Sequence, residues 1–288
     1  MISKMIIKKR ILLWFLLPSM VIATIATAFC YRYTYKVVKN NIYDQLEIAT
    51  GELRNNVNIF LSGKQSRTDD FSSDGFIKEC TEGIVRNDSR REYYIEALNT
   101  HLATNKKPLD PDIRDVFVIG LDGKVISSTD VGLLGMDISG ETYFSETVKR
   151  GSYISDLYYH PDYRQNTFFD VARIILRKNG QEGPIGIIVN RYNGHSLSKA
   201  IHWGIKGEPG QEEQLNGFGE TGEMYIVNSS KVMITESRFI EDAIFHQVVD
   251  TEGVRTAFGN RTGMTGIYPD YRDVPVLSVS KYFEEMNW

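Results

Sequence analysis

The sequence predicts an α+β fold in which an N-terminal transmembrane helix and a long stalk helix precede two tandem antiparallel-sheet modules. Three observations support this. An apolar run near the N-terminus is long enough to cross a bilayer, apolar residues then recur at helical spacing, and strand-turn-strand segments occur twice in the second half. The expected boundaries are 1–10 for a cytoplasmic N-terminus, 11–31 for the transmembrane helix, 32–110 for the stalk and linker, 111–200 for a membrane-distal module and 201–288 for a membrane-proximal module.

The composition is that of a globular protein with one apolar segment. Of the 288 residues, 42% are hydrophobic and 24% are charged, which excludes a disordered chain and a protein with many spans. The net charge of −4 argues against a nucleic-acid partner, which calls for a basic face. Cys30 lies in the apolar run, so Cys80 is the one thiol of the soluble part and a disulfide-framed scaffold is excluded.

Residues 11–31 contain no charged residue and can cross a hydrocarbon core of roughly 30 Å at about 1.5 Å per residue. Lys4, Lys8, Lys9 and Arg10 precede this run, so the positive-inside rule places the N-terminus in the cytoplasm. A cleaved signal peptide is the alternative, because Ala26-Thr27-Ala28 resembles a cleavage site, although the run exceeds the usual signal core. Either way the bulk of the chain lies outside an inner or plasma membrane.

The stalk is predicted from apolar residues at steps of three and four: Val37, Val38, Ile42, Leu46, Ala49, Leu53, Val57, Phe60 and Leu61. Polar residues between Ser62 and Asp74 predict a break, a second helical stretch runs to about Leu102, and 105–111 form a turn. The stalk can carry displacement or form a dimer seam, or it can pack on its own domain; both interpretations stay open.

Two segments of the second half resemble each other. Residues 117–119 and 124–126 flank a Gly-Leu-Asp-Gly turn, and residues 225–227 and 231–233 flank Asn-Ser-Ser, so each predicts a β-hairpin. Apolar strands follow at 184–189 and 275–280. Two related modules explain this order.

Within the first module, Asp137 or Ser139 is expected to cap a short helix that runs through Val148 and ends at Gly151. A strand is predicted at 168–176, a turn at 178–180, and a second strand from about Ile185. A helix starting near Ser196 and a Gly/Glu-rich stretch at 204–219 connect the modules.

The sequence offers no catalytic or cofactor motif. The glycines of 217–222 match a dinucleotide-binding pattern, but a polar run precedes them where a strand is needed. The five histidines stand at no spacing typical of zinc ligands. We therefore expect no enzyme activity, no metal and no cofactor in this chain.

Aromatic and charged side chains of the first module form the candidate binding site, because such mixtures line small-molecule pockets. Tyrosines are also good strand residues, so a purely structural role is the competing interpretation. The candidate ligand-binding residues are Tyr143, Phe144, Tyr153, Asp156, Tyr158, Asp170, Arg173 and Arg191.

Three stretches resemble the double Cache family, the tandem PAS-like sensor domains of bacterial chemoreceptors and sensor histidine kinases of two-component systems. They are the strand-Asp-Gly-strand segment 116–128, the helix-to-strand passage 137–156, and the closing segment with Gly263-Met264-Thr265-Gly266, Asp270-Tyr271-Arg272 and Trp288. The resemblance covers about 44–288. It implies a distal ligand-binding Cache module, a proximal Cache module, and a homodimer.

The resemblance also bears on the ligand. Members that bind amino acids carry Arg-x-Trp-Tyr where this chain has Glu141-Thr142-Tyr143-Phe144, so the arginine and tryptophan are missing. Arg191 is similar in position to their pocket aspartate and would oppose an ammonium group. Our hypothesis is that Arg191, with Arg173, favours an anionic ligand such as a carboxylate.

The sequence thus predicts the ligand-sensing region of a transmembrane signal-transduction receptor, without catalysis. The cytoplasmic signalling module is expected outside this chain. The alternatives are an anchored extracytoplasmic scaffold without a small ligand and an anchored enzyme.

Overall fold

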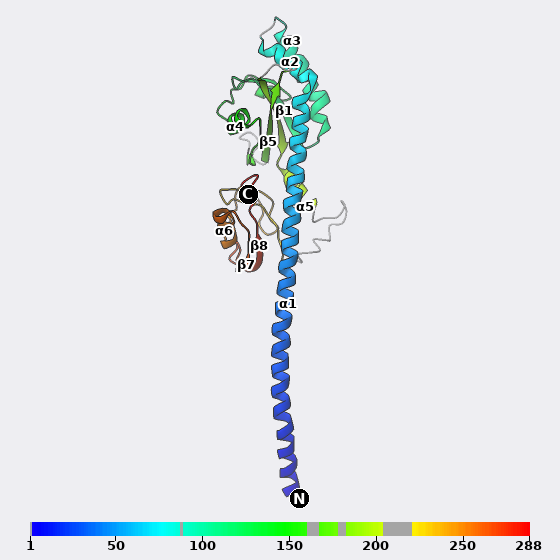
Figure 1. The fold of residues 1–288 in the computed structure, drawn as a ribbon, viewed down its shortest axis with the longest axis vertical. Coiled ribbons are helices and arrows are strands. Elements are labelled where there is room, and N and C mark those ends of the chain that lie inside the picture. The colour runs from blue at the N-terminus through cyan, green and yellow to red at the C-terminus, as the bar shows by residue number, and fades with distance from the viewer. Residues whose placement is uncertain (1, 87–88, 160–166, 178–182, 204–220) are drawn as a thin grey trace. The chain divides into compact units, whose positions relative to one another are not determined.

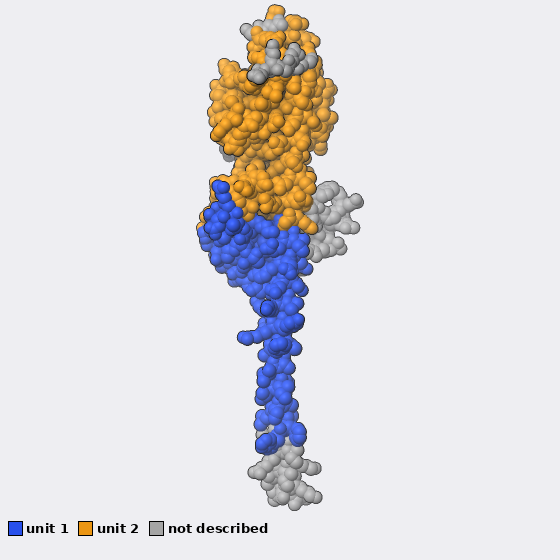
Figure 2. Space-filling view, in the orientation of Figure 1, with its two compact units in different colours: residues 1–50, 251–281 blue, residues 51–250, 282–288 orange. Residues whose placement is uncertain are grey.

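A computed structural model describes the chain from Ile2 to Trp288, except for residues 87–88, 160–166, 178–182 and 204–220 and the side chains of 2–13 and 201–203. The chain forms two compact units (Figure 2): unit 1 comprises residues 1–50 and 251–281, and unit 2 comprises residues 51–250 and 282–288. A long apolar helix followed by antiparallel sheets confirms the predicted α+β class (Figure 1). The module boundary at residues 200 and 201 remains a prediction.

Helix α1 (Ile2–Ser73) runs without interruption, so the predicted break between Ser62 and Asp74 is wrong. The polar side chains there bond back to the helix: Thr68 Oγ1 donates to the carbonyl of Lys64 at 3.0 Å. The chain leaves the helix at Asp74, whose carboxylate caps the next helix, α2 (Gly75–Val85). Among the described residues, α1 is the one helix long and apolar enough to cross a membrane.

Unit 2 contains a six-stranded antiparallel sheet with the order β2-β1-β6-β5-β3, and β4 pairs with β5 beside this path. The strands are β1 (Ile113–Ile119), β2 (Val125–Ser128), β3 (Ser152–Ile154), β4 (Tyr158–Tyr159), β5 (Thr167–Leu176) and β6 (Pro184–Asn193). The predicted hairpin at 117–126 and the strands predicted at 168–176 and from Ile185 are confirmed.

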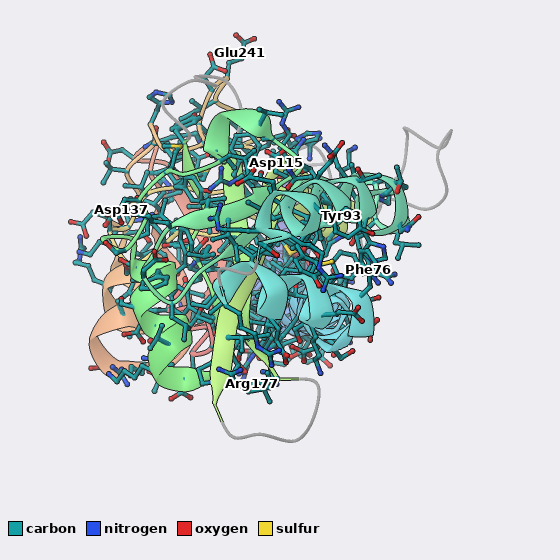
Figure 3. The ribbon with its side chains drawn as sticks, turned by 90° about the horizontal axis from the view of Figure 1, so that it is seen from above. Phe76, Tyr93, Asp115, Asp137, Arg177 and Glu241 are labelled. Atoms are coloured by element: carbon teal, nitrogen blue, oxygen red, sulfur yellow. The ribbon has the colours of Figure 1, made fainter. Side chains whose placement is uncertain are left out.

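Helices cover both faces of this sheet. On one face, Val116, Val118 and Tyr192 pack in a core with side chains of α1, α2 and α3 (Arg91–His101). On the other face, Phe117 and Ile119 pack with α4 (Thr142–Arg150). Alternate residues of a strand point to opposite faces, so each strand serves both cores. Figure 3 shows Phe76 and Tyr93 on the helical side of unit 2 and Asp137 on the opposite side.

Helix α4 ends as predicted, because Gly151 adopts the left-handed conformation at φ +85°. Its predicted cap is wrong. The helix begins after Glu141 without a side-chain cap, and Asp137 instead accepts from the backbone N–H of Ser139 at 3.0 Å in the preceding turn.

Shorter segments complete unit 2. After α3 come a π-helical turn (Leu102–Lys106) and a 3₁₀ turn (Lys107–Leu109), and a 3₁₀ turn (Val131–Leu133) follows β2. Helix α5 (His195–Trp203) follows β6 close to the predicted position. The hairpin predicted at 225–233 is reduced to isolated bridges that join Val227 to Met233 and Val232 to Val248.

In unit 1, α6 (Glu252–Asn260) packs near a hairpin of β7 (Met264–Pro269) and β8 (Pro275–Ser280), the last of which matches the prediction. A Cβ at Gly253 would overlap the hydroxyl groups of Tyr268 and Ser280, so only glycine lets α6 approach the hairpin this closely. Glu47 of α1 accepts a hydrogen bond from Thr265 Oγ1 at 3.1 Å.

Candidate functional site

Three neighbouring strands place one charged residue each side by side on the face that α4 covers. In the antiparallel register, Asp115 of β1 and Asp170 of β5 are both direct partners of Arg191 on β6. Direct partners point to the same face of a sheet. The site is therefore a row of acid, base and acid across the middle of the sheet.

Arg191 and Asp170 form a buried, two-point ion pair. Arg191 Nε donates to Asp170 Oδ1 at 3.0 Å and Nη2 donates to Oδ2 at 3.3 Å. Asp170 is 0% exposed and Arg191 8% exposed. Tyr158 Oη donates to the same Oδ2 at 2.8 Å. No hydrogen bond joins Arg191 Nη1 to another residue in the described part of the chain, so this edge of the guanidinium can still donate.

Aromatic rings enclose the guanidinium. Arg191 Cζ lies 5.2 Å from the ring centroid of Phe117 and 5.9 Å from that of Tyr158, distances at which a cation is attracted to the ring face. Phe117 stands two residues after Asp115 on β1 and shares its face. A planar, charged donor group is thus held in an apolar frame.

Burial sets the electrostatics of this site. It raises the pKa of Tyr158 and of Tyr143, and the charge of Asp170 raises both further, so each phenol stays a hydrogen-bond donor. Burial alone would lower the pKa of Arg191, but the Asp170 carboxylate raises it, so Arg191 stays charged.

Asp115 differs from Asp170 in its partners. It is 7% exposed, and burial raises its pKa against the opposing charges of Lys107 and Arg114. Both cations lie 3.8 Å from its carboxylate oxygens, and no hydrogen bond to that carboxylate occurs among the described residues. An oxygen acceptor with unused capacity therefore stands beside Arg191.

The structure brings together four of the predicted site residues, Tyr143, Tyr158, Asp170 and Arg191. Phe144 and Tyr153 pack, half-buried, against the same core and border the group. Arg173 lies on the other face of the sheet, where its Nε is 3.2 Å from Asp69 Oδ1 of α1. An odd step along β5 separates Arg173 from Asp170, and this reverses the direction of the side chain.

Asp156 stands apart from the charged row and binds the end of the chain. Its Oδ1 accepts from Trp288 Nε1 at 2.9 Å, and burial raises its pKa against this hydrogen bond. Three residues later, Tyr159 Oη donates to the carbonyl of Ile244 at 3.1 Å, and its ring lies 4.8 Å from that of Phe245. The segment 156–159 therefore contacts both the charged row, through Tyr158, and the segments around 244 and 288.

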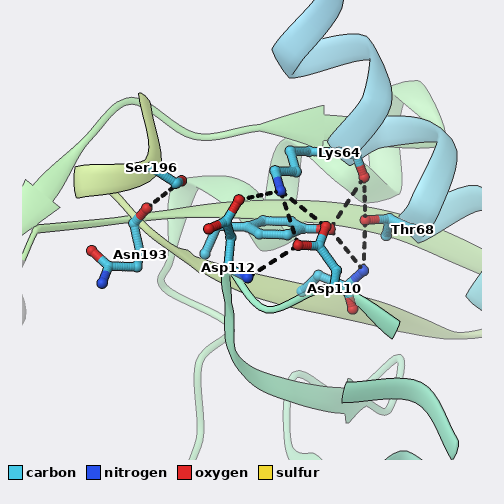
Figure 4. A network of polar contacts seen from close by, with 8 residues as sticks. Lys64, Thr68, Asp110, Asp112, Asn193 and Ser196 are labelled. Atoms are coloured by element: carbon cyan, nitrogen blue, oxygen red, sulfur yellow. Dashed lines mark hydrogen bonds and ion pairs between the residues drawn. The ribbon is translucent and has the colours of Figure 1, made fainter. Parts of the chain in front are cut away.

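The opposite face of the same strands holds α1 (Figure 4). Lys64 Nζ lies 2.9 Å from Asp110 Oδ2 and 2.7 Å from Asp112 Oδ2, and 4.9 Å from the ring centroid of Tyr192. Asn190 Nδ2 donates to Thr68 Oγ1 at 2.9 Å. Asn190 and Tyr192 flank Arg191 on β6, so adjacent residues of one strand contact α1 and the charged row.

Sequence reasoning missed Asp115, Phe117 and the Lys64 group. An acidic residue directly before an apolar run, with an aromatic residue two positions on that shares its face of the strand, is a usable signal for Asp115 and Phe117. Of the other motifs, His160 and the glycines of 217–220 lie outside the described residues. In the described part of the chain, no three His, Cys, Asp or Glu side chains are placed to hold a metal ion.

No protein-family model and no curated protein sequence matches this chain. Solved structures do match its fold. The sensor domain of the histidine kinase DctB from V. cholerae is 12% identical, covers 79% of this chain and 76% of its own, and has a TM-score of 0.52. The ligand-binding domain of the Campylobacter jejuni chemoreceptor Tlp3 in complex with L-valine is 14% identical over 82% of this chain and 86% of its own, with a TM-score of 0.50.

A second structure of the Tlp3 sensory domain is 13% identical, covers 83% of this chain and 87% of its own, and has a TM-score of 0.50. These neighbours are double Cache sensor domains, and the long helix and antiparallel sheets found here are consistent with the Cache fold. The chain therefore has the double Cache fold of sensor domains from chemoreceptors and histidine kinases.

Proposed function

We propose that this chain is the extracytoplasmic sensing region of a membrane-anchored signalling receptor and that its distal module binds a small carboxylate-bearing metabolite. The observation that carries the proposal is Arg191, a buried, charged guanidinium framed by two rings, whose Nη1 has no hydrogen-bond partner among the described residues. Arg is the side chain best suited to a planar carboxylate. That a Tlp3 domain of the same fold holds L-valine supports a small-molecule ligand.

An amino acid is also compatible with the charges at this site. From the sequence, Arg191 alone was expected to face the ammonium group of an amino acid. In the structure two carboxylates, those of Asp170 and Asp115, flank Arg191. Because Asp170 neutralises Arg191, recognition rests on hydrogen-bond geometry more than on net charge. We propose that a ligand carboxylate binds Arg191 Nη1, and that an adjacent ammonium group, where present, faces Asp115.

We further propose that α1 anchors the chain with the bulk outside the membrane, that two copies pair, and that the output module lies outside this chain. Ligand binding would act on α1 through β5 and β6, because Asn190 and Tyr192 hold α1 from the positions next to Arg191. Ligands shift such an equilibrium only by their differential affinity for its two states.

A thermal-shift screen of the full chain in detergent tests the ligand class, because a ligand that binds the folded state raises the melting temperature. Three sets of compounds are compared: organic acids, free amino acids, and amines without a carboxylate. We expect stabilisation from members of the first two sets. Stabilisation by the amines alone contradicts the proposed role of Arg191, and a well-folded chain that responds to no metabolite favours a scaffold function.

A further inference from the structure

A stripe of basic residues follows the apolar run on helix α1. Arg32, Lys36 and Lys39, here named the juxtamembrane stripe, stand at steps of four and three residues, which places them within about 60° of one another around the helix. Arg32 and Lys36 are exposed, and neither has an ion-pair or hydrogen-bond partner in the described part of the chain. Lys39 Nζ lies 5.5 Å from the ring centroid of Tyr43.

The charges of the chain are separated along its length. No acidic residue precedes Asp44, and residues 44–288 hold 26 of the 33 Lys and Arg residues against all 37 Asp and Glu residues. The domain beyond the stripe is therefore acidic and is repelled by an anionic surface. Basic residues on the translocated side of a span are disfavoured during insertion. A group of three there, none of which forms an ion pair among the described residues, points to a partner of opposite charge.

The helix sets the height of the stripe above the bilayer. Counted from Tyr31 at about 1.5 Å per residue, Lys36 lies about 7.5 Å and Lys39 about 12 Å beyond the apolar run, and the headgroup layer is about 5–8 Å thick. Helical side chains lean toward the N-terminus of their helix, which here is the membrane end. Long basic side chains reach back further along their apolar stems.

Aromatic side chains flank the stripe on both sides. The rings of Tyr31 and Tyr35 are stacked with centroids 6.5 Å apart, and those of Phe29 and Tyr33 are stacked at the same distance. Tyrosine is enriched at the level of the headgroups. These residues place the stripe at the membrane surface.

We propose that the juxtamembrane stripe binds the phosphate groups of anionic phospholipids in the extracytoplasmic leaflet. The inference rests on the proposed membrane anchoring by α1. The three contacts fix the depth of α1 and its rotation about its axis, since they all lie on one side of the helix.

Native mass spectrometry of the full chain, titrated with phosphatidylglycerol or with phosphatidylcholine of the same acyl length, tests this. Each basic residue near an anionic surface contributes about a fivefold preference and three together about a hundredfold, so R32Q/K36Q/K39Q should lose about a hundredfold of the preference for phosphatidylglycerol. Gln keeps the helix propensity of Lys and Arg. The control K78Q/K124Q/K149Q removes the same charge from unit 2 and should change nothing.

The variant K4Q/K8Q/K9Q/R10Q removes the basic residues before the span and leaves the juxtamembrane stripe intact. It should keep the preference for phosphatidylglycerol that the stripe supplies. A stripe variant that binds phosphatidylglycerol as the wild type does overturns the inference and leaves the anchoring intact. Carbonate extraction of the chain from membranes distinguishes the other failure: an extractable chain contradicts the anchoring itself and the inference with it.

Discussion

Arg191 lies directly opposite Asp170 in the register of β6 and β5, and the two side chains meet at 3.0 and 3.3 Å on the face that α4 covers. This pair is at once the polar centre of the candidate ligand site and a buried ion pair of unit 2. Measurements of the free energy of unfolding test its role as an ion pair, and measurements of ligand affinity test its role in the candidate site.

Removal of one partner of this pair should destabilise the protein strongly. Arg191→Met leaves the Asp170 carboxylate buried with only the Tyr158 hydroxyl as a side-chain donor, and such unpaired charges cost about 3–5 kcal/mol. Chemical denaturation followed by circular dichroism measures the loss. In the double variant D170N/R191M the loss should fall well below the sum of the single variants, and strict additivity would show that the two charges do not interact.

The hydroxyl of Tyr158 should contribute more to the free energy of unfolding than the hydroxyl of Tyr159. Tyr158→Phe removes a hydrogen bond to a buried carboxylate, which we expect to cost about 1.5–3 kcal/mol of unfolding free energy. Tyr159→Phe, the matched control, removes a bond to the neutral carbonyl of Ile244 from a partly exposed side chain and should cost about 1 kcal/mol or less. Equal losses in the same denaturation experiment would contradict this ranking.

Lys64 should anchor α1 to the sheet of unit 2. Lys64→Met leaves Asp110 and Asp112 without their shared cation and should destabilise unit 2 by about 3 kcal/mol. Hydrogen exchange in residues 57–73 should rise at the same time. Arg67→Met on the same helix is the control, because its pair with Asp70 is long and exposed and contributes about 0–1 kcal/mol. Unchanged exchange in the Lys64 variant would place the anchor of α1 elsewhere.

His101 should make unit 2 less stable in mild acid. Burial lowers the pKa of His101, the charge of Asp74 opposes this shift, and that of Lys106 reinforces it. The unfolded chain, with an ordinary histidine pKa, then takes up the proton first as the pH falls. The stability that neutral His101 contributes to the folded state is therefore present above about pH 6.5 and is lost progressively below it.

The free energies of unfolding of wild type and His101→Gln at about pH 7.5 and about pH 5.5 measure this effect. From the higher to the lower pH, the free energy of unfolding should fall more in the wild type than in His101→Gln. Asp115 and Asp156 have raised pKa values and act in the opposite sense, but they are present in both proteins and cancel in the comparison. A variant that loses as much as the wild type would exclude His101 as the cause.

How far the sequence predicts the fold depends on the type of signal. Alternating apolar residues and turn glycines predicted β1, β2, β5 and β6 correctly, because burial and turn geometry leave local traces. The predicted break after Leu61 is wrong because Lys64 and Thr68, polar in sequence, have partners far along the chain that no local pattern shows: Asp112 before β1 for Lys64, and Asn190 of β6 for Thr68. The N-cap of α4 failed because Asp137 satisfies a turn that lies before the helix.

The residues of the site could be predicted from their aromatic and charged composition, but their contacts depend on the register between strands and could not. Tyr158, Asp170 and Arg191 were identified as an aromatic and charged group, but their direct contact depends on how β5 pairs with β6. Arg173 illustrates the limit: a step of three residues along β5 from Asp170 turns its side chain to the face of α1. Asp115 escaped notice because its place beside Arg191 is set by pairing between strands far apart in sequence.

The proposed ligand site is tested most directly by calorimetric titration of a carboxylate metabolite from the thermal-shift screen into the full chain. Arg191→Lys keeps the charge but loses the forked geometry, and Arg173→Lys makes the same change on the opposite face of the sheet. We expect Arg191→Lys to weaken binding by about 10–100-fold, the value of a charge-assisted hydrogen bond, and Arg173→Lys to bind as the wild type does. Equal affinity of the Arg191 variant and the wild type would contradict a ligand site at Arg191.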